Sequence, residues 1–365
     1  MKYQKINILP NLNVKPIVLN AFIFFAYTLL FSLENDHYIF KQILLFIFFL
    51  TYLLTCNELK INYKFLILSF FVILFSFLFK ENINNYHLIP ILYLIVFIFN
   101  NKDRSFYLEN FFFFLNSFVF FLSILILLGF NNYVNFQNTS FIIIGLPGLF
   151  YIKNKLYFYL NLSTLALISF LFLERQIFLI LLIILLLNFL KSENEKNLNK
   201  LFFITIFANL VFLIYLINLK DSIFLNDIFN KRPVLYDYYF QLILKSNIVN
   251  IIFGHGYLEN DNEFFFNMAE YFSWLQFRFR SFSPHNFILI LTYTYGLFGL
   301  IVLFLFLCKF FSLDKIFKEK KIMLIFLITG TLQSFNFLSH QPVSIMFSLL
   351  VITTLKSESK NFSNI

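Results

Sequence analysis

The stretch that decides this fold begins at Lys231-Arg232-Pro233, continues through Gly254-His255-Gly256-Tyr257 and Ser283-Pro284-His285-Asn286, and ends at Gly296-Leu297-Phe298-Gly299. It holds the only long polar interval of an otherwise apolar chain. Of the 365 residues, 60% are hydrophobic and only 13% are charged, whereas soluble domains carry about 25% charged residues. Apolar runs long enough to cross roughly 30 Å of hydrocarbon recur along almost the whole length. We therefore expect an all-α fold, a polytopic membrane helix bundle that forms a single integral membrane domain over residues 1–365.

The apolar runs predict about twelve transmembrane helices. They lie near residues 17–33, 39–56, 62–80, 86–100, 110–130, 140–152, 156–173, 175–190, 201–219, 286–310, 321–338 and 340–355. The sixth run is short and has Pro147 between Gly145 and Gly148, so it is either a full span or a broken, re-entrant helix. With a re-entrant helix there, the chain would have one span fewer and the orientation of its second half would invert.

The basic residues predict the orientation, because cytoplasmic connections are enriched in Lys and Arg. They fall into alternate connections, which carry Lys2, Lys5 and Lys15; Lys60 and Lys64; Lys102 and Arg104; Lys153 and Lys155; Lys191, Lys196 and Lys200; Lys309, Lys315, Lys318, Lys320 and Lys321; Lys356 and Lys360. The short connections on the other side hold only Lys41, Lys80 and Arg175. This pattern places both termini in the cytoplasm and makes the interval 220–285 an extracytoplasmic loop with amphipathic helices. It also accounts for the formal charge of +9, so nucleic acid is not an expected partner.

The cysteines, the first apolar run and the interiors of the spans exclude other classes of protein. Cys56 and Cys308 fall near predicted cytoplasmic helix ends, with no spacing typical of a disulfide or a metal site. The first run lacks a cleavage site of small residues, so we expect a retained span rather than a signal peptide. The spans carry almost no internal charge, which argues against an ion-coupled transporter and favours a protein that works at a membrane face.

Two arginines are expected at the outer ends of helices. Pro233 suits a first helical turn, so Arg232 should begin an amphipathic helix on the membrane surface, where backbone N–H groups and the helix dipole favour an anion. Arg175 lies in the tight outer connection between two spans. Each arginine has an alternative role, Arg175 as a snorkelling residue paired with Glu174 and Arg232 as a contact to lipid headgroups.

The histidines and Asn286 are the other candidate polar groups. His285 is expected at the positive end of the helix that follows Pro284, where a neutral imidazole can accept a proton from a sugar hydroxyl or simply be solvated. Asn286 can orient an acceptor or a phosphate oxygen. The glycines around His255 predict a tight turn with a close backbone approach, and His255 is either a ligand-facing group or a polar turn residue.

The remaining polar residues near this stretch have weaker signals. Arg278 and Arg280 suit either phosphate steering or headgroup contact, and His340, two residues before Pro342, could join the site. The acidic segment 259–263 lacks the spacing of a calcium loop, so it predicts the start of an interfacial, aromatic-rich helix. Gly296 and Gly299 predict close packing by another helix.

A family resemblance follows from the order of these motifs. Arg175 starts a span on the outer face, and the segment from Arg232 to Tyr236 has the form Arg-x-x-x-aromatic. The Gly254-x-Gly256 turn comes next, and Pro284-His285-Asn286-Phe287 then runs into a helix with Gly296-x-x-Gly299. The chain thereby resembles the O-antigen ligase and polymerase superfamily of bacterial envelope polysaccharide assembly. The topology matches over nearly the whole chain, and the sequence resemblance is concentrated in residues 232–300.

The resemblance implies an inverting, metal-independent transfer of a glycan from an undecaprenyl-diphosphate carrier to a sugar hydroxyl, at the outer leaflet of the bacterial inner membrane and without a cofactor. Arg175 and Arg232 would bind the diphosphate leaving group, and His285 would position or deprotonate the acceptor hydroxyl. The further substrate-binding candidates are Asn286, His255, Arg278, Arg280 and His340. Other polysaccharide assembly proteins are possible partners.

The chain departs from the family's pattern in three places. Tyr236 stands where the family has Trp, no Pro precedes Gly254, and there is no large C-terminal domain, which argues against the protein-glycosylating members. The short chain and biased composition favour a polymerase over a ligase.

Two other classes of protein remain as alternatives. A flippase for lipid-linked sugars predicts a charged central cavity. A scaffold predicts that replacing His285 or Arg232 has no effect on glycan profiles.

Overall fold

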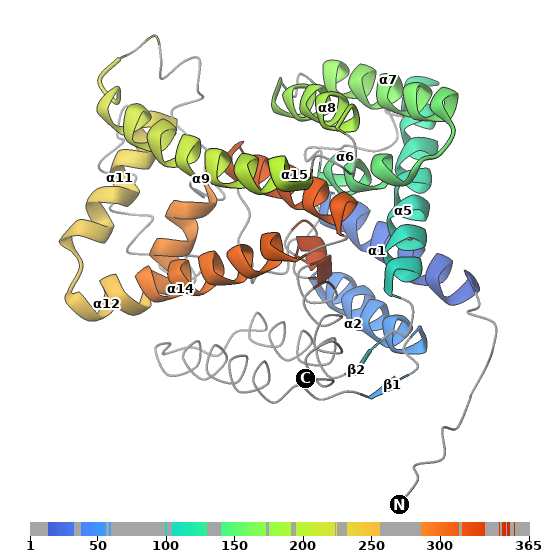
Figure 1. The fold of residues 1–365 in the computed structure, drawn as a ribbon, viewed down its shortest axis with the longest axis horizontal. Helices are drawn as coiled ribbons and strands as arrows, with labels where there is room; N and C mark the ends of the chain where they lie inside the picture. Colours follow the sequence, from blue (N-terminus) through green and yellow to red (C-terminus); the bar gives the residue numbers. More distant parts are fainter. Residues whose placement is uncertain are drawn as a thin grey trace, which may run out of the picture.

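The computed structural model describes residues 14–32, 38–55, 58–59, 99–100, 104–129, 140–172, 175–190, 195–222, 224, 232–255, 286–313, 316–332, 343, 345–347, 349–350 and 354. Within them the chain is helical apart from one antiparallel pair of two-residue strands, β1 (Glu58–Leu59) and β2 (Phe99–Asn100) (Figure 1). The all-α class is therefore confirmed. A bundle of about twelve spans is not, because the predicted spans 62–80 and most of 86–100 and 340–355 lie outside the described residues.

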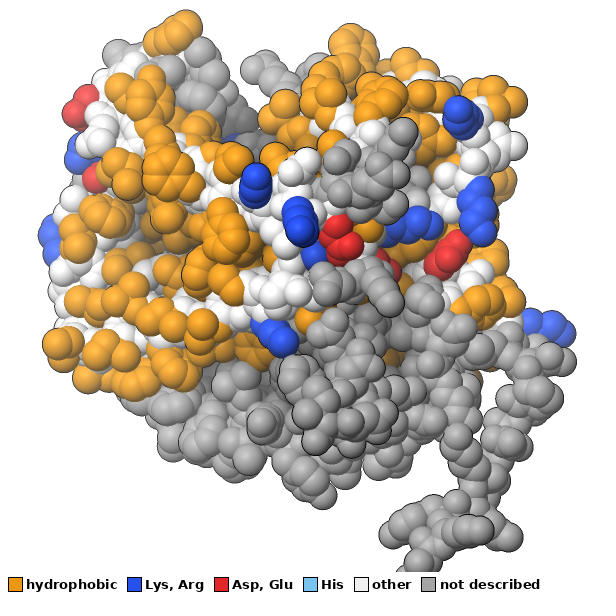
Figure 2. All heavy atoms as spheres, viewed as in Figure 1, with side chains coloured by type: hydrophobic (Ala, Val, Ile, Leu, Met, Phe, Trp, Pro, Cys, Tyr) orange, Lys and Arg blue, Asp and Glu red, His pale blue; other side chains and the backbone are white. Residues whose placement is uncertain are grey.

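Three of the described helices are long and apolar enough to cross a membrane, namely Phe106–Leu127, Glu195–Asn218 and Phe287–Ser312. Shorter apolar helices cover Val14–Leu30, Phe40–Leu54, Phe141–Tyr151, Lys155–Leu171 and Ile177–Asn188. Many of their large apolar side chains are exposed, such as Phe170, Phe178 and Phe207, and apolar side chains cover much of the described surface in Figure 2. A helical surface of this kind is what contact with lipid requires, so the apolar helices indicate a membrane protein.

The N-terminal helices are joined by a buried amide. α1 (Val14–Ser32), α2 (Tyr38–Leu54) and α5 (Arg104–Leu127) pack together. The Asn20 amide of α1 donates to Phe48 O at 2.8 Å and to Thr51 Oγ1 at 2.9 Å, and it accepts a 2.7 Å bond from the Tyr107 hydroxyl. Such interhelical hydrogen bonds help to hold apolar helices together where lipid removes the hydrophobic driving force between them.

The sixth predicted span is a broken helix. α6 (Ser140–Gly145) gives way to the 3₁₀-helix η3 (Leu146–Tyr151), with Pro147 in the first turn of η3. The two pieces extend over about 9 Å and about 12 Å, which is less than the roughly 30 Å of a bilayer core. Of the two alternatives for residues 140–152, the structure therefore has the broken one.

The segment formed by α6 and η3 nevertheless runs back along α5. A Cβ added at Gly145 would lie 2.9 Å from the Val119 side chain. One added at Gly148 would collide with the backbone of Phe112. Further along, Lys153 Nζ lies 3.6 Å from Glu109 Oε1, near the start of α5. The segment thus runs antiparallel to α5.

A group of lysines at the start of α15 (Phe317–Leu332) contacts the ends of three other helices. Lys320 Nζ lies 2.9 Å from Glu195 Oε1 at the start of α9 (Glu195–Asn218). Lys321 Nζ donates a 2.8 Å bond to Leu190 O, just beyond α8 (Arg175–Asn188). Lys318 Nζ sits 4.8 Å from the centroid of the Tyr151 ring of η3. We call Lys318, Lys320 and Lys321, with Glu195 and Leu190 O, the lysine clasp.

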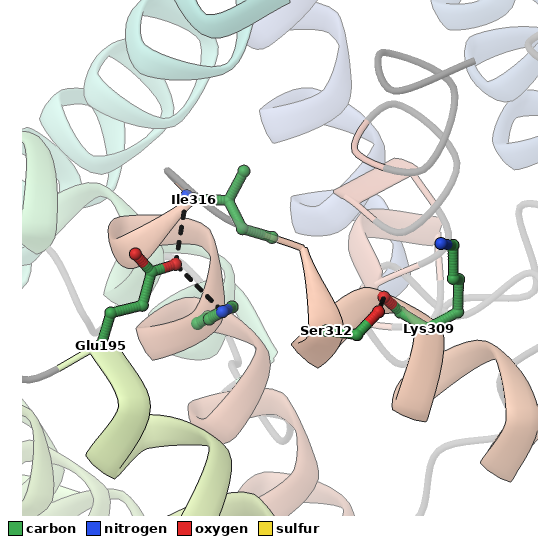
Figure 3. Close-up of polar contacts among 5 residues, drawn as sticks. Glu195, Lys309, Ser312 and Ile316 are labelled. Carbon is green, nitrogen blue, oxygen red and sulfur yellow. Dashed lines mark hydrogen bonds and ion pairs between the residues drawn. The ribbon is translucent and has the colours of Figure 1, made fainter. Parts of the chain in front are cut away.

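The lysine clasp brings together chain ends that the basic residues assign to one side of the membrane. Ile316 N donates a 3.4 Å bond to Glu195 Oε1, close to where α14 (Phe287–Ser312) ends (Figure 3). α7 (Lys155–Leu171) begins just after η3 and packs against α8. The described helix ends beside the predicted cytoplasmic connections around residues 153, 191–195 and 309–321 therefore lie close together.

Candidate functional site

α11 (Arg232–Lys245) begins at Arg232, as predicted, with Pro233 in its first turn. The prediction of an amphipathic surface helix is wrong for its first half, because α11 packs against α9 and α14 and turns its polar residues toward them. Its buried residues are Arg232, Pro233, Tyr236, Asp237, Tyr238 and Tyr239. Arg232 is only 7% exposed, so it is not a headgroup-facing side chain. A guanidinium at that depth must be offset by polar neighbours.

Tyr236 lies one helical turn after Arg232, on the same face of α11. It is fully buried, and burial raises its pKa to about 12, while the charge of Arg232 and a hydrogen bond with the Asn286 side chain act in the opposite direction. The phenol is therefore neutral at physiological pH and cannot serve as a phenolate base. The Arg-x-x-x-aromatic spacing thus presents a cation and a neutral hydroxyl together, beside Asn286.

Asn286 is the N-cap of α14 and is completely buried. Its Oδ1 accepts bonds from Ile288 N at 3.0 Å and Leu289 N at 3.3 Å, which satisfies donors that a helix start leaves without partners. Its Nδ2 donates a 3.0 Å bond to Asn209 Oδ1 in α9. The amide is thus engaged within the protein, and its first effect is to fix where α14 begins. We call Tyr236, Asn286 and Asn209 the amide relay.

α14 is interrupted at Gly296, whose φ of 66° and ψ of −168° are not helical. The predicted span 286–310 is present as α14, but Gly296 divides it into helical pieces over 287–295 and 297–312. Breaking a helix releases backbone carbonyls, and the Tyr293 carbonyl accepts a 2.7 Å bond from His255 N. A discontinuous helix of this kind is tolerated in membrane proteins only where other groups bond the freed backbone.

The two glycine motifs form one contact at this break. α12 (Ile248–Phe253) ends at Gly254, which has φ +84°. A Cβ at Gly254 would collide with the backbone of Thr294, and a Cβ at Gly296 with the Ile252 carbonyl. The predicted close backbone approach is confirmed at both glycines, whereas Gly256 lies outside the described residues. At Gly299 the three atoms nearest to an added Cβ belong to Tyr295 of the same helix, and the packing of another helix there stays a prediction.

His255 is half-buried and belongs to this contact. Its ring stacks on Tyr293 with centroids 4.7 Å apart. Its Nε2 lies 2.6 Å from Ser246 Oγ, and its Nδ1 lies 3.4 Å from Asn250 Nδ2. Ser246 donates its proton to Leu242 O at 2.5 Å, so Nε2–H donates to Ser246 and Nδ1 accepts from the amide. The histidine therefore does not activate this serine as a base, and the contacts favour the turn role for His255.

The other predicted residues are placed less completely. α8 begins at Arg175, as predicted, at the end of the helix away from the lysine clasp; nothing is described of its side chain. The start of α11 also lies away from the clasp, because Lys220, just after α9, pairs with Asp237 at 2.8 Å. Four candidates lie outside the described residues, namely His285, Arg278, Arg280 and His340.

Two features of the site were missed from the sequence. Asn209 is a polar amide in the interior of the apolar run 201–219, which is a signal of a specific partner. Asp237 is the acidic residue of α11, and its side chain is only 4% exposed against Lys220. Among the described residues, no group of three or more His, Cys, Asp and Glu could hold a metal ion.

No family model, no curated protein and no solved structure matches this chain.

Proposed function

We propose that the protein is an O-antigen or surface-polysaccharide polymerase or ligase. It transfers a glycan from an undecaprenyl-diphosphate carrier to a sugar hydroxyl, with inversion and without a metal, at the outer leaflet of a bacterial inner membrane. Both termini are cytoplasmic, and the lysine clasp lies on that side. Polymerase is favoured over ligase, and other polysaccharide assembly proteins act with it.

One observation carries the proposal: the hydrogen bond between Tyr236 and Asn286. It joins the Arg-x-x-x-aromatic motif to the Pro-His-Asn motif, which are the two most informative parts of the family resemblance and lie far apart in the sequence. Arg232 begins the helix on one side of this bond, and His285 directly precedes Asn286 in the sequence. The contact is what one shared reaction centre requires.

The proposed reaction needs a cation beside the diphosphate, where negative charge develops as it leaves. The acceptor oxygen attacks the anomeric carbon from the face opposite the carrier, the bond from that carbon to the diphosphate oxygen breaks, and the diphosphate leaves with the bonding electrons. The Arg232 guanidinium and the N–H groups at the start of α11 stabilise that leaving group, with Arg175 as a second cation. His285 takes the proton of the acceptor hydroxyl.

The test is the glycan profile of a deletion strain complemented with variants. We expect Arg232→Ala to lower product by about 10²- to 10³-fold, the usual loss when one charge-stabilising donor is removed. Lys245→Ala, an exposed change at the other end of α11, should leave the profile unchanged. Single repeats on the lipid A–core identify a polymerase, and bare core identifies a ligase.

The same strain separates transfer from transport. A lost transferase leaves carrier-linked glycan on the outer leaflet, because the donor has already crossed the membrane. Accumulation on the cytoplasmic leaflet, or a normal profile with Arg232→Ala at normal protein levels, would overturn the proposal.

A further inference from the structure

Asn209 is a buried amide in an otherwise apolar part of α9. It is 3% exposed, and its Oδ1 accepts the 3.0 Å bond from Asn286 Nδ2. An amide in such surroundings is costly unless it is hydrogen-bonded. The bond links residues 77 positions apart. Asn209 lies about 14 Å before the end of α9 along the helix axis. The contact therefore lies within the helix bundle rather than at its rim.

A comparison with a second buried amide pair shows what is particular about Asn209. Asn161 Nδ2 of α7 donates a 2.6 Å bond to Asn116 Oδ1 of α5, and both residues are 0% exposed. That pair joins the interiors of two helices, as interhelical hydrogen bonds in membranes commonly do. The partner of Asn209 is instead the N-cap of α14. Its bond therefore controls the orientation of a side chain that sets where a helix starts.

We propose that Asn209 is a positioning residue for glycan transfer, which acts through Asn286 and rests on the proposed function. It holds the Asn286 amide in the one orientation in which Oδ1 caps α14 and the side chain also meets Tyr236. Asn286, which follows His285 in the sequence, is thereby kept next to the turn of α11 that begins at Arg232. Reaction rates respond steeply to misplacement of reacting groups, by as much as about 10²-fold for 1 Å.

The donor and acceptor roles predict which substitutions matter. Asn209→Leu has a similar volume and removes the acceptor, so the Asn286 amide loses its restraint and its Nδ2 is left without that partner. Asn209→Asp keeps an acceptor oxygen in the same place and should restore function. Asn161→Leu is the matched control, because it removes an equally buried amide from a pair that does not touch the site.

The experiment uses the full-length protein in membranes, with a lipid-diphosphate-linked glycan as donor and its acceptor. We expect Asn209→Leu to lower kcat per folded molecule on the order of 10- to 100-fold at nearly unchanged KM, and Asn209→Asp to recover most of it. Asn161→Leu should reduce the amount of folded protein but not its kcat. Hydrogen–deuterium exchange at Ile288 and Leu289 should become faster in Asn209→Leu only, because their N–H groups bond to Asn286.

The outcomes separate the two proposals. Faster exchange with an unchanged kcat, or an equal loss of kcat in Asn161→Leu, overturns the positioning role and leaves the proposed function to stand on Arg232. An absence of any transfer by the wild-type protein overturns the proposed function, and this role with it.

Discussion

Two contacts along α9 use different chemistry. At its start, Glu195 pairs with Lys320 at 2.9 Å, and the neighbouring Lys321 bonds to a backbone carbonyl at 2.8 Å. Toward its other end, Asn209 meets Asn286 at 3.0 Å through neutral amides. Glu195 and Asn209 lie about 21 Å apart along the axis of α9, so the two sets of contacts are well separated.

The difference shows which role suits the lysine clasp and which suits the amide relay. Charges attract over several ångströms in many orientations, so the lysine clasp gathers helix ends without fixing one side-chain rotamer. An amide works only when donor and acceptor face each other, so the amide relay fixes an orientation. A contact that only holds helices together can use charges, which attract in many orientations. A contact that positions reacting groups needs a fixed orientation, which amides provide.

The largest expected effect comes from filling the contact between α12 and the break in α14. Gly254→Ala forces a Cβ into the backbone of Thr294 at a φ of +84°, and should destabilise the protein by about 2–5 kcal/mol. The thermal unfolding midpoint of detergent-purified protein measures the effect. Gly129→Ala is the matched control, since its φ is +97° but nothing lies within 4 Å of the added Cβ; it should cost only about 1–2 kcal/mol. Equal losses for both glycines would mean that the contact is not formed.

An intermediate effect is expected at the lysine clasp. Lys320→Met keeps the volume but removes the partner of Glu195. Because the Glu195 side chain is 23% exposed, water offsets part of the loss and we expect a cost of about 1–3 kcal/mol. The unfolding midpoint should fall while kcat per folded molecule is unchanged, and exposed Lys196→Met should change neither. A fall in kcat with a normal midpoint would contradict the structural role of this end.

The smallest effect is expected from Tyr236→Phe. The change removes one hydrogen bond with Asn286 and no charge, because burial raises the pKa of Tyr236 to about 12 and the phenol is neutral. The cost should be about 0.5–1.5 kcal/mol, with a smaller fall in kcat than Asn209→Leu produces. Tyr215→Phe, at a position 56% exposed on α9, should have no effect. A kcat above the wild-type value in Tyr236→Phe would show that this bond does not help to position the site.

The features that local chemistry dictates could be predicted from the sequence. Pro233 marked the start of α11 at Arg232, and the span predicted from residue 286 begins at Phe287, because the signals of a helix start act within a few residues. The cap role of Asn286 was not predicted. Lys318, Lys320 and Lys321 contact neighbouring helix ends, and the side of the membrane on which they lie stays a prediction.

The features that depend on distant partners could not be predicted. The break at Gly296 is stable because Gly254 and His255 lie against it, and no local pattern shows that contact. Helical spacing suggested that α11 was a surface helix, but packing against α9 and α14 buries its first half. The partner of Asn209 is 77 residues away, so the sequence shows only that an amide lies inside an apolar run.

Thiol labelling from one side of the membrane tests the central claim most directly, namely that the amide relay and the lysine clasp face opposite sides. With Cys56 and Cys308 replaced by Ser, single cysteines are introduced at half-exposed Ser222, just beyond α9, and at exposed Ser312, near the clasp. In right-side-out vesicles, a membrane-impermeant maleimide should label Ser222→Cys at once and Ser312→Cys only after permeabilisation, with the reverse order in inverted vesicles. Labelling of both positions from the same side would contradict the account.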